Sequence, residues 1–569
     1  MELNIRIAGS AGQGMQTIGY ILSKAFARGG LEVFSVMDYQ SRVRGGHNYF
    51  QIRVSDKKIT AKIDELDILV ALDLNTIDSD MNDVKESGVI IYDGEETAAD
   101  AISCENCVNI PFTSLAVEAT KSKLYSNSIA VGAVFGLIDY DMDILYSVLE
   151  EFFSKKKGAD ITKNNIEAVN KGADFAKKLE NKPDFERVPS ADSEKMLING
   201  NEAIALGALA AGCKFFCSYP MTPSTSIFVN AAKYSHDFDV VVEQAEDEIA
   251  AVNMIIGASY AGARSMTTTS GGGYCLMTEG IGFAAIAEIP IVIVNSQRSG
   301  PSTGLPTRTE QGDLLFAINA SHGDFPHIVL APSSPKDAFH LTMKAFELAD
   351  KFQTPVTMLD DQFLADTYVT VKKFDLENVK IDRSIIDTDE LNAMEQYNRY
   401  EITDSGISPR ALPGQSKHVV VSDSDEHTAD GHLTEDIEAA LLQKDKRSKK
   451  LWYIMRDLGL PQTYGSPQAK TVLITWGSSF GVAKELLLKK SNGKLSLINL
   501  QEVWPISSEF FMNNLKGKKA ITIEGNQTGQ MARLIRQVSG IKVDSILKYD
   551  GRPFTLDYLE EKLTERGVI

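Results

Sequence analysis

Two loops in this sequence carry hydroxyl and guanidinium groups in positions where a small anion could be bound. The first loop covers residues 217–225 (Cys-Ser-Tyr-Pro-Met-Thr-Pro-Ser-Thr) and follows an apolar run that predicts a strand over 215–219. Thr222 is a good helix N-cap and Pro223 suits the first helical position, so a hydroxyl would lie beside free helix-start amides. This arrangement suits a carboxylate or a phosphate, although a plain helix cap would have the same sequence.

The second loop, residues 297–308, follows the most apolar predicted strand, over 289–295. Its Arg298 offers a planar fork that can grip a carboxylate in two places. A surface arginine would have the same local sequence. We favour the binding interpretation because Thr222 and Arg298 both follow predicted strands, whose carboxyl ends would form one rim of a parallel sheet where ligands bind.

An acidic cluster stands between a strand predicted over 240–243 and a helix. Most of the acids in residues 243–248 (Glu-Gln-Ala-Glu-Asp-Glu) would complement the helix dipole or face solvent. Glu248 differs because the small apolar residues Ile249 and Ala250 follow it, which would carry it toward a buried face. A buried carboxylate of this kind is a candidate proton partner.

Two glycine-rich loops would allow close backbone approach by a ligand or a neighbouring chain. Residues 270–273 (Ser-Gly-Gly-Gly) follow a predicted strand, with a tight packing turn as an equal alternative. Near the N-terminus, Gly9-x-Ala11-x-x-Gly14 half fits a dinucleotide fingerprint, because alanine replaces the second glycine. The basic residues within 42–47 could meet phosphates or form a salt-bridge cluster.

The five cysteines offer little chemistry. Cys104 and Cys107 have the spacing of metal ligands, but no second pair lies nearby to complete four ligands. Cys213, Cys217 and Cys275 lie near predicted core elements and are expected to be buried thiols. An odd, sparse set is not a disulfide framework, so we expect a cytoplasmic protein with no iron–sulfur cluster or metal site of its own.

Charge and hydropathy argue against several classes of protein. The 569 residues include 58 basic and 77 acidic side chains, for a net charge of −19, which disfavours a nucleic-acid-binding surface and a polybasic membrane anchor. We find no long uncharged apolar run, so neither a membrane span nor a targeting segment is expected.

Alternating predicted strands and helices indicate an α/β fold of three α/β domains, with a doubly wound parallel sheet in the central one. The first domain is placed at residues 1–185, before a polar linker with two prolines, and the second at 194–370. Residues 371–465 have few apolar runs and much charge, which predicts an extended connection or insertion. The third domain covers 466–569.

Several motifs, in order, resemble the 2-oxoacid:ferredoxin oxidoreductases, which are thiamine diphosphate enzymes of anaerobic metabolism. Met221 replaces the isoleucine that is usual in the family, a conservative change in volume. The segments that resemble the alpha subunit are 219–223 (Tyr-Pro-Met-Thr-Pro), 246–251, 298–307 and 310–314 (Glu-Gln-Gly-Asp-Leu). Those that resemble a gamma subunit, here fused at the N-terminus, are 9–14 and 44–46, and those that resemble the C-terminal, transketolase-C-like domain are 524–530 and 549–554.

The resemblance implies a role for each matched residue. Thr222 would contact the 2-oxoacid near its reacting carbonyl, Arg298 would bind the carboxylate, and Thr307 would line the same pocket. Gly12 and Gly14 of the N-terminal loop are candidates for binding coenzyme A.

The family also has a glutamate that hydrogen-bonds the aminopyrimidine of thiamine and promotes its ylid. We assign this role to Glu248, because it stands nine residues before Gly257, as the family's glutamate stands before its helix glycine. Glu246 is the alternative.

The sequence lacks the Gly-Asp-Gly motif with a downstream asparagine that the resemblance implies for binding Mg²⁺ and diphosphate. This chain would therefore hold only the pyrimidine half of thiamine diphosphate. A beta subunit would bring Mg²⁺, the diphosphate site and a [4Fe–4S] cluster, in an (αβ)₂ heterotetramer whose active site is shared between chains.

The predicted function is CoA-dependent oxidative decarboxylation of a 2-oxoacid, with electrons passed to ferredoxin. The fused gamma–alpha form resembles 2-oxoglutarate and broad-specificity members, so 2-oxoglutarate is favoured over pyruvate or branched-chain acids. Two rival hypotheses are a transketolase-like or indolepyruvate-type enzyme complete in one chain, and a non-catalytic partner subunit that binds CoA or a nucleotide.

Overall fold

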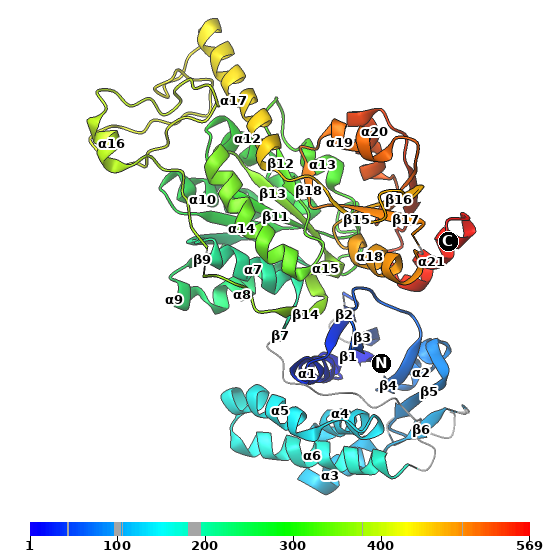
Figure 1. Ribbon diagram of the computed structural model, residues 1–569. Helices are drawn as coiled ribbons and strands as arrows, with labels where there is room; N and C mark the ends of the chain where they lie inside the picture. The colour runs from blue at the N-terminus through cyan, green and yellow to red at the C-terminus, as the bar shows by residue number, and fades with distance from the viewer. Residues whose placement is uncertain (42–44, 96–103, 105, 180–194, 378, 492) are drawn as a thin grey trace. The chain divides into compact units, whose positions relative to one another are not determined.

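The computed structural model describes residues 1–569 apart from 42–44, 96–103, 105, 180–194, 378 and 492, and apart from the side chains of 154–157. The chain forms two compact units, which are described separately (Figure 1). Unit one comprises Met1–Ile198, Thr367–Phe374 and Thr555–Tyr558, and unit two comprises Asn199–Asp366, Asp375–Phe554 and Leu559–Ile569.

Unit one is built on a mixed eight-stranded sheet in the order β6-β5-β4-β1-β3-β2-β14-β7. Its strands are β1 (Glu2–Ala11), β2 (Glu32–Asp38), β3 (Gly45–Ser55), β4 (Leu66–Ala71), β5 (Val84–Tyr92), β6 (Cys107–Asn109), β7 (Lys195–Ile198) and β14 (Tyr368–Lys372). The strand β4 is mostly buried and pairs in parallel with both β1 and β5. The strand β3, which the sequence analysis did not predict, pairs antiparallel with both β1 and β2.

The helices of unit one bury apolar stripes against this sheet and against one another, in a core that runs from β1 to α6. The helices are α1 (Met15–Arg28), α2 (Leu74–Asp80), α3 (Phe112–Thr120), α4 (Ser126–Leu137), α5 (Met142–Lys157) and α6 (Ala159–Lys177), with short 3₁₀ turns at Met81–Asp83 and Lys123–Tyr125.

Unit two holds a seven-stranded sheet in the order β18-β12-β13-β11-β10-β8-β9. Its strands are β8 (Phe215–Ser218), β9 (Val241–Gln244), β10 (Ser265–Thr269), β11 (Val292–Gln297), β12 (Ile328–Leu330), β13 (Val356–Asp361) and β18 (Glu502–Trp504). The predicted parallel sheet is confirmed, because every neighbouring pair from β12 to β9 is parallel and only β18 runs antiparallel.

Helices cover both faces of this sheet, which makes it doubly wound as predicted (Figure 1). They are α7 (Gly200–Ala210), α8 (Thr225–Lys233), α9 (Ser235–Phe238), α10 (Glu248–Tyr260), α11 (Gly271–Leu276), α12 (Thr278–Ile286), α13 (Leu314–Ile318), α14 (Pro335–Phe352) and α15 (Gln362–Asp366). The chain leaves β8 for β9 on one side and returns to β10 on the other, so the topological switch point lies between β8 and β10.

The last hundred residues add a five-stranded sheet in the order β15-β17-β16-β19-β20. Its elements are β15 (Gln462–Gly465), β16 (Thr471–Trp476), α18 (Ser479–Lys490), β17 (Leu495–Leu500), α19 (Ser508–Leu515), β19 (Lys519–Glu524), α20 (Gln530–Ser539), β20 (Asp544–Leu547) and α21 (Leu556–Glu565). Its apolar side chains join those of the central sheet in one core, and β18 completes the central sheet directly.

The segment between these two sheets differs from the extended connection that the sequence predicted. It contains α16 (Thr388–Ala393) and the long helix α17 (Ile437–Asp457). The charged side chains of α17 hid it from sequence analysis, since its buried positions are mostly polar: Gln443, Lys446, Arg447, Lys450 and Ile454.

Two expectations about cysteine are wrong. Cys275 is exposed, because it lies on an outward-facing position of the short helix α11, whereas Cys213 and Cys217 are buried as expected. Cys104 and Cys107, whose spacing was compared with that of metal ligands, form a disulfide, with their Cα atoms 5.4 Å apart. Within the described part of the chain, no helix combines the length and the apolar character that crossing a bilayer requires.

Candidate active site

The predicted site residues of unit two follow four neighbouring strands. Because β11, β10, β8 and β9 are adjacent and parallel, the loops after their carboxyl ends form one rim. Arg298 follows β11, residues 270–273 follow β10, Thr222 follows β8 and Glu248 follows β9. This rim includes the switch point, which is where open α/β sheets bind ligands.

Arg298 and Thr222 are in direct contact. The Arg298 Nη1 donates to the backbone oxygen of Thr222 at 2.7 Å, so the two loops singled out by sequence meet at the rim. The Arg298 Nε is buried and has no partner among the described residues, and burial lowers the pKa of this guanidinium. The arrangement leaves a partly desolvated cation that can take up an anion.

Thr222 is not the N-cap that the sequence predicted. The helix α8 begins at Thr225, because a turn forms first, in which Thr225 N donates to Met221 O at 3.2 Å and Ser224 Oγ donates to the same oxygen at 2.8 Å. The peptide bond between Thr222 and Pro223 is cis. The correction leaves the Thr222 hydroxyl on a loop at the rim instead of on a helix end.

A short series of contacts links this loop to Glu248. The Thr269 hydroxyl at the end of β10 lies 4.0 Å from Met221 Sδ. Gly273, the third residue of α11, lies against both Thr269 and Glu248, because a Cβ added there would stand 2.5 Å from Glu248 Oε1 and closer still to the Thr269 hydroxyl. Only glycine allows this close approach, which explains one glycine of the Gly-Gly-Gly run.

Glu248 is the first residue of α10 and is 4% exposed. Asp247 caps the helix by accepting from Ala250 N at 2.8 Å, and this turns Glu248 inward, as the small apolar residues after it predicted. Its Oε1 is buried without a hydrogen-bond partner among the described residues, whereas Glu246 is exposed. Of the two glutamates that the sequence left open, Glu248 is therefore the one with a free acceptor aimed into the fold.

Thr307 is buried in the loop that begins at Arg298. Two backbone bonds close this loop on itself: Ser299 N donates to Arg308 O at 3.1 Å, and Leu305 N donates to Ser299 O at 3.0 Å. Thr307 and Arg298 are thus held in one folded loop.

The far end of the same loop is anchored by the C-terminal sheet through Gln311. Its Nε2 donates to Trp476 O at 2.8 Å, its Oε1 accepts from Gly525 N at 2.8 Å, and Asn526 Nδ2 donates to Gln311 O at 3.1 Å. The two motifs at 310–314 and 524–530, which the sequence analysis noted separately, therefore contact each other.

Buried acids that sequence analysis did not single out lie behind the rim. Asp313 accepts from Asn295 Nδ2 at 3.0 Å, and burial, together with Glu310, raises the pKa of this carboxyl. Burial also raises the pKa of Asp360, at the end of β13. Asp313 lies within the motif 310–314, so this motif is the sequence signal that could have identified it.

In unit one, Gly12 and Gly14 adopt φ values of 97° and 84°, which only glycine takes readily. One amide of this loop already has a partner within the chain, since Ser10 N donates to Asp73 Oδ2 at 2.9 Å.

Of the basic patch at 42–47, residues 42–44 lie outside the described residues. His47 Nε2 lies 3.2 Å from Asp80 Oδ1, and this contact raises the pKa of His47.

Large apolar side chains are exposed on the elements that flank Glu248. Val241 lies on the edge strand β9, Ile249 and Met254 lie on α10, and Leu276 ends α11; each of the four is at least 43% exposed. Grouped exposure of this kind is typical of a surface that another chain covers.

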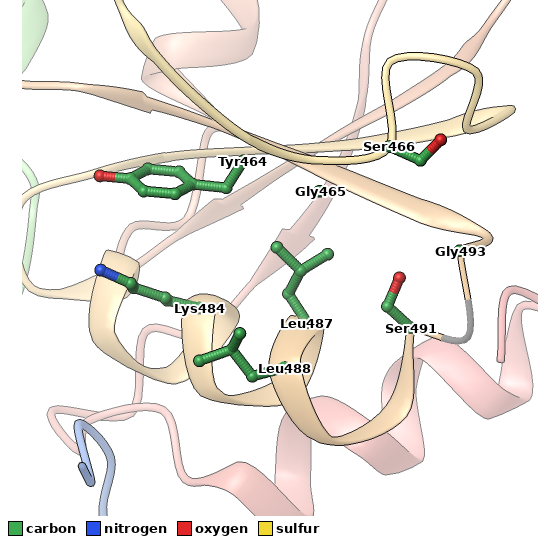
Figure 2. A pocket seen from close by; sticks show the side chains of 8 residues that line it. All are labelled: Tyr464, Gly465, Ser466, Lys484, Leu487, Leu488, Ser491 and Gly493. Atoms are coloured by element: carbon green, nitrogen blue, oxygen red, sulfur yellow. The ribbon is translucent and has the colours of Figure 1, made fainter.

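A pocket of about 380 Å³ opens in the C-terminal sheet region, between β15 and the end of α18 (Figure 2). Leu487 and Leu488 form its apolar side, and Lys484 lies over the ring of Tyr464 at 4.9 Å from its centroid. None of the predicted site residues lines it. Within the described residues, no cluster of histidine, cysteine or acidic side chains is placed to hold a metal ion.

Comparisons with known proteins agree with this geometry. Residues 206–444 match the family described as pyruvate flavodoxin/ferredoxin oxidoreductase, thiamine diphosphate-binding, and residues 4–175 match the family described as pyruvate ferredoxin/flavodoxin oxidoreductase. The 2-oxoacid:ferredoxin oxidoreductase subunit alpha of a Sulfolobus species is 33% identical over 99% of this chain and 96% of its own length. The 2-oxoglutarate synthase subunit KorA of Archaeoglobus fulgidus is 34% identical over 65% of this chain and 98% of its own.

A solved structure extends the likeness to the whole fold. The 2-oxoglutarate:ferredoxin oxidoreductase from Magnetococcus marinus, with 2-oxoglutarate, coenzyme A and succinyl-CoA bound, matches with a TM-score of 0.91 and 32% identity over 99% of both chains. The sheet, the rim and these matches define a subunit of a thiamine diphosphate-dependent oxidoreductase. The chain belongs to the family of 2-oxoacid:ferredoxin oxidoreductase alpha subunits, which confirms the resemblance noted in the sequence.

Proposed function

We propose that this chain supplies the substrate-binding and proton-handling half of an active site that a beta subunit completes, and that the substrate is 2-oxoglutarate. The observation that carries the proposal is the contact series across the rim, from Arg298 through Thr222 and Met221 to Gly273 and Glu248. The series places a cation, a hydroxyl and a carboxyl group along one edge of a parallel sheet.

Arg298 binds the carboxylate beside the keto group of the substrate. Its guanidinium is partly desolvated and has an unpaired Nε, so a charge-assisted hydrogen bond to a carboxylate would be strong there. The Thr222 hydroxyl, which stands on the loop that Arg298 contacts, donates to the keto oxygen. Thr307 closes the pocket from the other end of the Arg298 loop.

The residues present fit the aminopyrimidine of thiamine diphosphate. Glu248 offers a buried acceptor without a partner, and Gly273 beside it leaves room that any side chain would fill. Glu248 would hold a proton at Oε1 and share it with a ring nitrogen of the cofactor. When bound, thiamine diphosphate supplies the carbanion chemistry of the reaction, and the protein supplies position and electrostatics.

The remaining groups come from other chains in this proposal. The chain lacks the Gly-Asp-Gly signature for Mg²⁺ and diphosphate, and the exposed apolar side chains around Glu248 offer a surface for a beta subunit that carries them with a [4Fe–4S] cluster. An (αβ)₂ assembly, electron transfer to ferredoxin, coenzyme A binding near Gly12 and Gly14, and a cytoplasmic location stay predictions.

The choice of 2-oxoglutarate rests on named relatives. The Archaeoglobus relative is a 2-oxoglutarate synthase subunit, and the Magnetococcus structure was solved with 2-oxoglutarate and succinyl-CoA. Other relatives are named only for 2-oxoacids in general, so pyruvate and branched-chain acids are the competing substrates.

The test is CoA-dependent reduction of a viologen dye by the full chain coexpressed with a candidate beta subunit. We expect kcat/KM for 2-oxoglutarate to exceed that for pyruvate and for a branched-chain 2-oxoacid by at least about tenfold, because a second carboxylate adds a charge-assisted bond. A higher value for pyruvate would overturn the substrate assignment. Coenzyme A binding in a complex without thiamine-dependent turnover would favour a non-catalytic subunit.

A further inference from the structure

The helix α17 attaches to unit two by its charged face. Lys446 and Lys450 each lie 2.5 Å from an oxygen of Glu288, which is fully buried. Arg447 donates two hydrogen bonds to Glu426, at 2.9 and 2.7 Å, and Gln443 Nε2 donates to Tyr400 O at 2.9 Å. Because buried ion pairs are costly to break, they fix which face of the helix turns inward.

The opposite side of α17 exposes large apolar side chains near both ends of the helix, with exposed polar residues between them, whereas a surface helix usually turns its apolar side chains inward. Figure 1 shows α17 on the outside of unit two. Five large side chains on this face are 36–77% exposed: Ile437, Leu441, Leu451, Trp452 and Met455. Each of the five keeps enough exposed surface to contact another chain.

These side chains follow a heptad pattern with a polar centre. Positions three and four residues apart run Ile437, Leu441, Lys444, Ser448, Leu451 and Met455, which is the seam of a coiled coil. The pattern has the same form in both directions: two apolar positions, two polar positions, two apolar positions. A seam of this symmetry complements itself when a second copy runs antiparallel.

We propose that α17 packs antiparallel against α17 of a second copy of this chain. The layers would be Ile437 with Met455 of the second copy, Leu441 with Leu451 of the second copy, and Lys444 with Ser448 of the second copy. A parallel pair would place Lys444 against Lys444, which like charge disfavours. The polar central layer also fixes the register, since a shifted pair would bury lysine among leucines.

Charges on the flank of the seam support the same partner. In the antiparallel register, Glu438 faces the turn that carries Trp452 and Arg456 of the second copy. The Arg456 guanidinium already lies over the Trp452 ring, 5.2 Å from its centroid, where it can meet Glu438 of the second copy. Neither charge has an ion-pair partner among the described residues of its own chain.

Crosslinking tests the contact in the full chain, alone and in complex with its beta subunit. In Ser448→Cys, the two introduced thiols would stand on either side of the two-fold axis, within reach of a short bismaleimide. We expect a species of twice the chain mass, with a 448–448 link identified by mass spectrometry. The matched control is Lys336→Cys, at an exposed position on α14, which should give no such link. Wild-type protein, which keeps exposed Cys275, sets the background.

Charge reversal in the Ser448→Cys background tests the direction of packing. Glu438→Arg and Arg456→Glu should each lower the crosslink yield at least threefold, and the double reversal should restore it. Absence of the 448–448 link, a link from position 448 to the beta subunit, or failure of the double reversal to restore the yield would each overturn the proposal. Activity is not the readout, so these outcomes are independent of the proposed function.

Discussion

Two buried glutamates in unit two differ in whether their carboxylate oxygens have partners. Glu288, which follows α12, has both carboxylate oxygens paired with lysines from α17, and although burial by itself would raise its pKa, Lys450, Lys446 and Arg399 hold the pKa below its usual range. Glu248, at the rim, is buried with Oε1 unpaired. Buried polar groups are usually hydrogen-bonded, and the unpaired Oε1 of Glu248 is the group that we propose contacts the cofactor.

The comparison predicts that the open carboxylate matters for turnover and not for folding. Glu248→Gln keeps the shape of the side chain but cannot hold or release the proton, so we expect kcat to fall by about 10²- to 10⁴-fold. The midpoint of thermal unfolding should not fall, because Oε1 has no partner to lose. The measurement is steady-state dye reduction beside differential scanning calorimetry of the same preparation, and a kcat within threefold of wild type would remove Glu248 from the reaction.

The paired carboxylate should behave in the reverse manner. Glu288→Gln leaves two buried lysines without their counter-charge, and we expect a loss of about 3–5 kcal/mol in the free energy of unfolding. Denaturant titration of the full chain measures this loss. In protein that remains folded, KM for the oxoacid should be unchanged; a raised KM at full stability would show that the Glu288 cluster reaches the site.

Two arginines extend the comparison. Arg399 uses both of its terminal nitrogens, since Nη1 donates to Gln353 Oε1 at 2.8 Å and Nη2 donates to Glu288 O at 2.7 Å, whereas Arg298 has a buried Nε without a partner among the described residues. Arg298→Ala should raise KM for the oxoacid by about 10- to 100-fold, the size of one charge-assisted bond, with a smaller effect on kcat. Arg298→Lys should recover part of the affinity, and an unchanged KM in the alanine variant would refute the role of Arg298.

A partly buried histidine outside the rim has a shifted pKa although we propose no role for it in the reaction. Burial beside Phe325 lowers the pKa of His327 to about 4, below its ordinary 6.5, so the unfolded chain takes up a proton that the folded chain refuses. Between pH 6.5 and pH 4 the folded state therefore loses stability on acidification, by about 2 kcal/mol at pH 5 from this group.

The corresponding test is His327→Phe, which should flatten the decrease in unfolding free energy between pH 7 and pH 5 while kcat/KM at pH 7 stays the same. The pH series of wild type and variant, measured by chemical denaturation, checks the slope. An identical slope in both proteins would mean that His327 does not carry this penalty.

Much of the rim could be predicted from sequence, because each of its parts is local. An apolar run followed by Thr222, by Arg298 or by a glycine run predicts a strand and then a polar loop, and parallel strands bring such loops to one edge. Glu248 could be separated from Glu246 only in part, since the choice depends on which side chain Asp247 turns inward when it caps α10.

Other features depended on distant pairing and were missed or mistaken. Because of the turn at Met221, α8 begins at Thr225 and Thr222 is not its N-cap. The role of Gln311 could not be predicted from its neighbours in sequence, since it bonds to Gly525, directly after the strand that ends at Glu524. The helix α17 was not predicted, because its inward face is charged. No local sequence pattern indicates that Glu288, more than 150 residues away, neutralises the lysines of that face.

The amino-acid sequence alone determined the class of fold, the motifs and the side chains that we propose bind an oxoacid, since periodicity and loop chemistry act over a few residues. Only the tertiary structure decided which carboxylate is open and which is paired, and which face of α17 is exposed. Those outcomes depend on desolvation and on charges brought together across the chain, and such energies exist only once the chain is folded.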